Sequence, residues 1–108
     1  MAKGTFYALT KVADGSMQFL KREGTVFPNS MGLDLYLYHY KNETKKISDW
    51  SITEGRSGLA LAHGETKKEV TEKVNHILET VSKDDMQKNI DSAIEKWGCS
   101  PMYRATYL

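Results

Sequence analysis

One stretch of the chain, residues 33–40 with the sequence Leu-Asp-Leu-Tyr-Leu-Tyr-His-Tyr, constrains the fold more than any other. The leucines point to one side of an extended backbone, whereas Asp34, Tyr36, Tyr38 and Tyr40 point to the other. Alternation with a period of two is typical of a β-strand whose two faces differ chemically. The leucine face requires a buried partner, and we expect helices later in the chain to supply it.

Two amphipathic helices are predicted in the second half of the chain. Thr66–Glu69 is a capping box, in which the threonine and glutamate side chains bond the exposed backbone amides of a helix start. Ser82–Asp85 is a second cap of the same type. The apolar residues that follow at helical spacing are Val70, Val74, Ile77, Leu78 and Val81 in the first helix and Met86, Ile90, Ala93, Ile94 and Trp97 in the second. Gly98 is placed to end the second helix.

Four further strands are predicted from runs of aromatic, β-branched and other apolar residues. They span residues 5–12, 16–21, 47–53 and 59–62. The first two are joined by Asp14-Gly15, a dipeptide suited to a tight hairpin turn. Segment 22–32 is rich in turn-forming residues, so we expect a loop from which Val26 and Phe27 fold back onto the core. The tail, residues 100–108, is extended by composition.

The sequence therefore predicts a single α+β domain spanning residues 1–108. An antiparallel sheet of about five strands is covered on one face by two C-terminal helices, in the order β-β-loop-β-β-β-α-α-tail. Apolar residues make up 40% of the chain and charged residues 27%, which is typical of a globular protein. The order of the strands within the sheet is left open.

Charge and cysteine content narrow the class of protein. The 15 Lys and Arg residues nearly balance the 14 Asp and Glu residues, which disfavours binding driven by phosphate contacts. Cys99 is the only cysteine and cannot form an internal disulfide. No segment approaches the roughly 18 apolar residues of a membrane span, and residues 1–6 do not resemble a signal peptide. We therefore expect a cytoplasmic protein without a membrane partner.

No catalytic motif is visible. The histidines His39, His63 and His76 lack the spacing of a metal site on one element, and nucleotide-binding glycine loops are absent. Cys99 follows a predicted helix C-terminus, which is the wrong end to stabilise a thiolate. His63 flanks the first helix and is placed to help bind an anion there. We expect a non-enzymatic protein with no metal and no cofactor.

The tyrosine face is the candidate functional surface. The predicted partner-binding residues are Tyr36, Tyr38 and Tyr40 as anchors and Lys45, Lys46 and Arg56 around them. Three interpretations stay open: a cross-strand ladder that only stabilises the sheet, an interface with a protein or a second copy of the chain, and a stacking surface for single-stranded nucleic acid.

Two resemblances bear on function. Segment Gly58–Val70, with the sequence GLALAHGETKKEV, resembles the strand–Gly-x-Thr-x-x-Glu–helix junction of HicB-like antitoxins over 13 of the 108 residues. Val70 stands where that family has a small residue, and the family's upstream Pro-Gly is missing. In its short, neutral, motif-free character the chain is also similar to anti-CRISPR and other anti-defence inhibitors of phages and plasmids.

The leading hypothesis is a non-enzymatic, macromolecule-binding protein of mobile-element origin that inhibits a larger host protein. A nucleic-acid-binding module that uses the tyrosines and lysines is one alternative. An antitoxin-type regulator, which the first resemblance implies, is another. A homodimer formed through the tyrosine face is compatible with the first two hypotheses.

Overall fold

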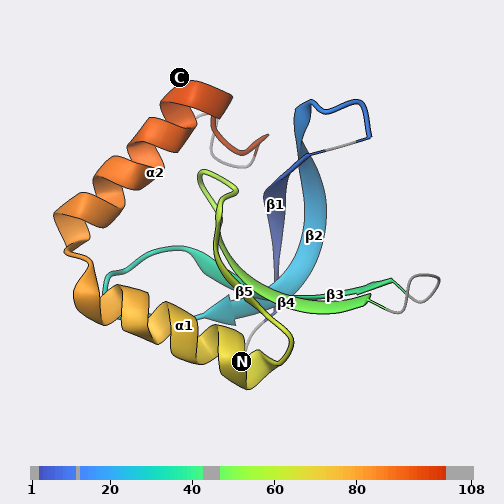
Figure 1. The fold of residues 1–108 in the computed structure, drawn as a ribbon. Helices are drawn as coiled ribbons and strands as arrows, with labels where there is room; N and C mark the ends of the chain where they lie inside the picture. The colour runs from blue at the N-terminus through green and yellow to red at the C-terminus, as the bar shows by residue number, and fades with distance from the viewer. Residues whose placement is uncertain (1–2, 12, 43–46, 102–108) are drawn as a thin grey trace.

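The computed structural model describes residues 3–11, 13–42 and 47–101. Five strands form one antiparallel sheet in the order β1-β2-β3-β4-β5, and two helices follow (Figure 1). The strands are β1 (Lys3–Lys11), β2 (Met17–Phe27), β3 (Leu35–Asn42), β4 (Ile47–Glu54) and β5 (Ala60–Gly64). The helices are α1 (Lys67–Thr80) and α2 (Lys83–Trp97). The predicted α+β fold is confirmed.

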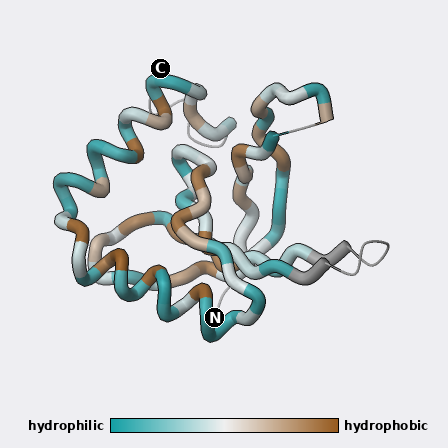
Figure 2. The backbone as a smooth tube through the Cα atoms, viewed as in Figure 1, coloured by the Kyte–Doolittle hydropathy of each residue, from teal (hydrophilic) through white to brown (hydrophobic). Residues whose placement is uncertain are grey.

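The core lies between the leucine face of the sheet and α1. Its fully buried residues are Leu35, Leu37, Ile52, Val70 and Val74. Phe27, Trp50 and Leu78 pack around them and are partly buried. Figure 2 shows the hydrophobic residues of α1 on its side toward the sheet and hydrophilic residues on its outer side. The alternation of residues 33–40 and the helical stripe thus bury each other, and this burial is the main stabilising term.

Both helices begin at the predicted caps. The Thr66 hydroxyl accepts a hydrogen bond from the Glu69 amide, and the Ser82 hydroxyl accepts one from the Asp85 amide, each at 3.1 Å. At the end of α2, Gly98 adopts a positive φ and its N–H donates to a carbonyl of the last turn. Neither helix has the length and apolar character needed to cross a membrane.

The second helix packs mainly beside the β4–β5 turn. Its buried residues are Met86, Ile90 and Ala93. Met86 and Ile90 line a small hollow together with residues of that turn. From the end of α1, α2 runs alongside the β4–β5 turn (Figure 1). Trp97, the last residue of the predicted stripe, is 42% exposed.

The β4–β5 turn is organised by Glu54, which is only 1% exposed. Its carboxylate accepts the backbone N–H groups of Arg56 and Ser57, each at 2.8 Å. The N–H of Gly58 donates to the Glu54 carbonyl, also at 2.8 Å. A buried carboxylate is stable only where hydrogen bonds compensate its lost hydration, and the turn supplies them.

The predicted loop over 22–32 is wrong for residues 22–27, which continue β2. Gly24 is not a turn residue here: a Cβ at this position would lie 2.6 Å from the Leu37 carbonyl oxygen, so glycine allows β2 to approach β3 closely. Phe27 packs onto the core as predicted. Val26 does not, because it lies on the opposite face of the strand and is 37% exposed.

The loop itself is held by Asn29. Its side-chain amide donates to the Leu33 carbonyl at 2.8 Å, and its carbonyl oxygen accepts the Leu33 N–H at 3.0 Å. Leu33 therefore precedes β3 and is not part of it, although its side chain still packs against the core.

The sheet curls because β2 changes partners. It pairs with β1 along Met17–Thr25 but with β3 only along Thr25–Phe27, so the β1–β2 hairpin rises from the plane of the other strands (Figure 1). The edge strand β1 then meets the β4–β5 turn, where the Leu9 N–H donates to the Gly58 carbonyl at 2.9 Å. The sheet is a partly closed barrel whose concave inner face is the tyrosine face.

Candidate functional site

The concave face encloses a groove of about 430 Å³. All five strands contribute to its lining, including Arg22 from β2, Tyr38 and Tyr40 from β3, Asp49 from β4 and His63 from β5. This volume lies within the range of ligand-binding pockets. The core lies between α1 and one face of β3 and β4, and the groove lies on the other face of the sheet.

Tyr36 lies under β1 and outside the groove lining. Its ring stacks on that of Phe6, with ring centroids 4.9 Å apart and an interplanar angle of 12°. Phe6 is itself fully buried. Stacked aromatic pairs of this geometry stabilise the structure beyond their buried area. Tyr36 thus acts as a structural part of the curled sheet in this arrangement.

Tyr38 and Tyr40 line the groove. The Tyr38 and Phe6 rings meet edge to face, with centroids 6.0 Å apart, and the Arg22 guanidinium lies over the Tyr38 ring at 5.6 Å from its centroid. A cation over an aromatic face is attracted by the ring quadrupole. Tyr40 is 39% exposed. The groove therefore offers aromatic surface and one guanidinium in the same place.

The predicted basic residues are not all brought to this groove. Lys45 and Lys46 lie outside the described residues. Arg56 lies in the β4–β5 turn, where its carbonyl accepts the Ser100 N–H at 2.8 Å. Within the described lining of the groove, the tyrosines are accompanied by Arg22 and not by Arg56.

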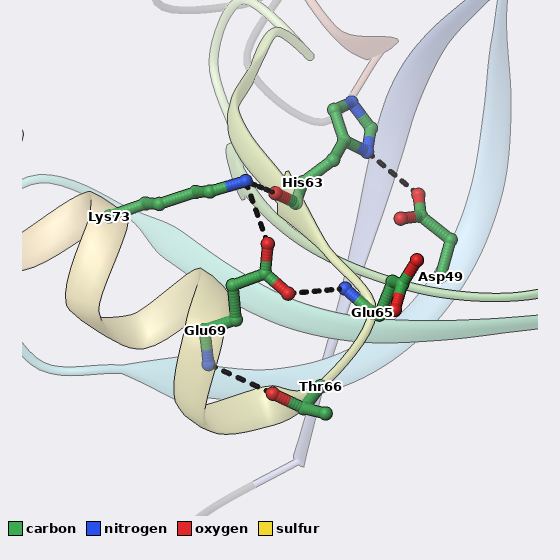
Figure 3. Close-up of polar contacts among 6 residues, drawn as sticks. All are labelled: Asp49, His63, Glu65, Thr66, Glu69 and Lys73. Carbon is green, nitrogen blue, oxygen red and sulfur yellow. Dashed lines mark hydrogen bonds and ion pairs between the residues drawn. The ribbon is translucent and has the colours of Figure 1, made fainter.

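His63 faces Asp49 across the β4–β5 pair, with Nδ1 2.8 Å from a carboxylate oxygen (Figure 3). Asp49 lies opposite Tyr40 on the neighbouring strand, so the pair stands at the rim of the groove. The expected role of His63 beside the helix amides is therefore wrong in this structure, because the ring is turned toward β4.

The start of α1 is occupied by a carboxylate of the chain itself. Glu69 accepts the Glu65 N–H at 3.1 Å and is paired with Lys73 at 3.1 Å (Figure 3). These contacts, the Lys73 hydrogen bond most of all, lower the pKa of Glu69. Lys73 also donates to the His63 carbonyl at 2.8 Å, which ties β5 to the helix.

His39 and Cys99 do not line the groove. His39 stacks on Trp50 on the core side of the sheet, with centroids 4.0 Å apart, and Cys99 is buried. Across residues 3–11, 13–42 and 47–101, no three His, Cys, Asp or Glu side chains are grouped as a metal site. No family model, curated protein or solved structure matches the chain.

Sequence reasoning identified the tyrosine face but did not include Phe6, Arg22 or the Asp49–His63 pair among the predicted partner-binding residues. Strand alternation already assigns Asp49 to a face of β4, but matching that face to the tyrosines needs the β3–β4 register. Arg22 was hidden within the predicted loop. Its position over Tyr38 follows from the unexpected length of β2 and from the curl of the hairpin.

Proposed function

We propose that this chain is a non-enzymatic protein-binding domain whose groove receives a segment of a larger protein and thereby inhibits it. The observation that carries the proposal is the gathering of Tyr38, Tyr40 and Arg22 in one open hollow. Tyrosine and arginine are enriched among the residues that dominate binding energy in protein interfaces. A concave aromatic site favours an inserted segment over a flat contact.

The charges of the groove support a protein partner over nucleic acid. Arg22 and Lys11 contribute positive charges from two different strands, whereas the Asp49 carboxylate contributes a negative one beside His63. A site for a phosphate backbone needs several cations in a row, since phosphate contacts supply most of its affinity. The nucleic-acid alternative retains the tyrosines as stacking surfaces, and it predicts binding that weakens steeply with salt.

Capture from a cell lysate, after nuclease treatment, tests the proposal. The bait is compared with its Tyr40→Ser and Trp97→Ser variants. Trp97 is a matched control because it is an aromatic residue of similar exposure, 42% against 39%, on α2. Truncation of an interface anchor typically costs 2 kcal/mol or more. We expect Tyr40→Ser to lose about 30-fold in affinity for the captured protein, and Trp97→Ser to bind as the wild type does.

Each other outcome has a defined meaning. Equal capture by all three baits would contradict the groove as the binding site. Capture that disappears with nuclease would favour the nucleic-acid alternative. If light scattering shows a dimer that Tyr40→Ser converts to a monomer, the groove serves self-association instead. The inhibitory part is tested by adding the wild type and Tyr40→Ser chains to the purified partner and measuring its activity.

A further inference from the structure

We propose that the groove binds an extended, acidic segment of the partner, which pairs as an additional strand with the outer edge of β1. This inference rests on the proposed function and specifies the chemistry of the occupant. Three features support it. The backbone of β1 points into the groove, the edge of β5 is blocked, and the Arg22 guanidinium has no carboxylate partner among the described residues.

The two end strands of the sheet face each other across the groove. Among the described residues, the backbone hydrogen bond from Leu9 to Gly58 joins β1 to the β4–β5 turn. From this junction on, the two strands lie on either side of the groove. Leu9 and Lys11 line it from β1, and Ala60 and His63 line it from β5. The groove is therefore the gap that would have to be filled to close the barrel.

The backbone of β1 is directed into this gap at alternate residues. In an antiparallel strand, the N–H and C=O of one residue point to the same side, and successive residues point to opposite sides. Because the Leu9 N–H points away from β2 to Gly58, the backbone groups of Tyr7 and Lys11 point the same way. A Cβ built on Gly58 would lie 3.0 Å from the Tyr7 oxygen, which agrees with this direction.

The edge of β5 is blocked in a different way. The Lys73 ammonium donates to the His63 carbonyl at 2.8 Å and is itself held by Glu69 at 3.1 Å (Figure 3). A charged side chain on a strand edge commonly prevents further pairing. The edge that can accept a new strand is therefore β1, where the Leu9 carbonyl and the backbone groups of Lys11 point into the gap, while the Leu9 N–H is already bonded to Gly58.

The side chains around this edge leave space for a strand. Small residues line the walls of the groove: Ala8, Thr10, Ser51, Thr53 and Ala60. Strand addition of this kind draws affinity from main-chain hydrogen bonds and specificity from pockets for alternate side chains. The rings of Tyr38 and Tyr40, which line the groove, supply such a surface for the inward-pointing side chains of the added strand.

The charge of the occupant follows from Arg22. Within the described residues its guanidinium has no carboxylate partner; it contacts the Tyr38 ring and, at 3.4 Å, the carbonyl of Lys21. The nearby Asp49 carboxylate is engaged by His63. Arginine forms its strongest pairs with carboxylates, so we infer that the inserted strand places Asp or Glu against Arg22.

The probe for this proposal is a random heptapeptide library displayed on phage and selected on the wild type chain. Peptides that bind should be enriched in residues of high strand propensity with one acidic position. The affinity of a synthetic selected peptide is then measured for Lys11→Pro and its matched control Lys11→Gln. Proline removes the outward N–H and places its ring on the edge, whereas glutamine keeps the N–H and removes only the charge.

We expect Lys11→Pro to weaken binding about tenfold and Lys11→Gln to change it less than about twofold. Arg22→Gln should weaken the acidic peptide about tenfold but leave its Asp→Asn or Glu→Gln analogue unchanged. Equal binding by the two Lys11 variants would overturn strand pairing, as would a selection without binders. Equal binding by wild type and Arg22→Gln would overturn the acidic specificity.

A second measurement does not depend on the proline variant folding. Hydrogen exchange of the Lys11 amide in the wild type chain should slow when the peptide is added, and an unchanged rate would contradict the proposal. The outcomes also separate the two levels of inference. A captured protein that requires Tyr40 but tolerates Lys11→Pro would leave the proposed function standing and remove strand pairing. A captured protein that tolerates Tyr40→Ser would remove the proposed function.

Discussion

Gly58 is the position where one methyl group should open the barrel. Its φ of +74° lies in the left-handed region, and a Cβ would lie 2.8 Å from the Leu9 nitrogen and 2.9 Å from the Phe19 ring. These neighbours belong to the β1–β2 hairpin, so the methyl group can be accommodated only if the hairpin moves. Gly58→Ala therefore breaks the junction at which the groove closes.

The expected loss of stability has three parts. An alanine in the left-handed region costs about 1–2 kcal/mol. Forcing apart well-packed atoms adds about 1–3 kcal/mol, and the lost Leu9–Gly58 hydrogen bond about 1 kcal/mol. We expect Gly58→Ala to lower the free energy of unfolding by about 3–6 kcal/mol. Gly15→Ala is the matched control, because Gly15 also has a positive φ, +87°, but a Cβ there meets nothing within 4 Å. It should cost only about 1–2 kcal/mol.

Urea unfolding followed by tryptophan fluorescence measures both values, and each kcal/mol should lower Tm by about 4 °C or more in a domain of this size. The reasoning fails if Gly58→Ala costs no more than Gly15→Ala. In that case the hairpin is not held against the β4–β5 turn, and the groove is not closed at that end. A large cost for Gly58→Ala alone would establish the junction in solution.

Three further predictions concern stability. Glu54→Gln should destabilise the fold by about 1–3 kcal/mol in urea unfolding, because one buried N–H loses its acceptor, whereas Glu79→Gln on the exposed side of α1 should change it by less than about 0.5 kcal/mol. Ile90→Ala should lower the free energy of unfolding by about 2–5 kcal/mol, because Ile90 is buried where α2 packs. A loss near zero would show that α2 is not packed there. The Lys73 hydrogen bond lowers the pKa of Glu69 below its ordinary 4.5, so this stabilisation is complete above pH 4.5 and is lost as the pH falls through the folded-state pKa. Glu69→Gln should therefore flatten the fall of Tm as the pH drops below 4.5, and parallel curves would contradict this assignment.

The sequence by itself determined the local elements. The alternation at 33–40 identified a two-faced strand, and the boxes at Thr66 and Ser82 located both helix starts, where the hydroxyls accept the expected amides. These features were predictable because strand alternation, helical periodicity and capping depend on residues a few positions apart. The apolar stripes also identified which faces are buried, since each element can hide its apolar side only against another.

Only the tertiary structure decided that the tyrosine face of the sheet curls into a groove. Gly24 belongs to the segment predicted as a loop, but in the structure it lies where β2 passes closely over β3 and changes partners. That change of partner lifts the hairpin, stacks Tyr36 on Phe6 and places Arg22 over Tyr38. Periodicity assigns a side chain to one face of a strand, whereas curvature depends on the register between strands far apart in the sequence. The tyrosine face was therefore visible in the sequence, but its curling into a groove was not.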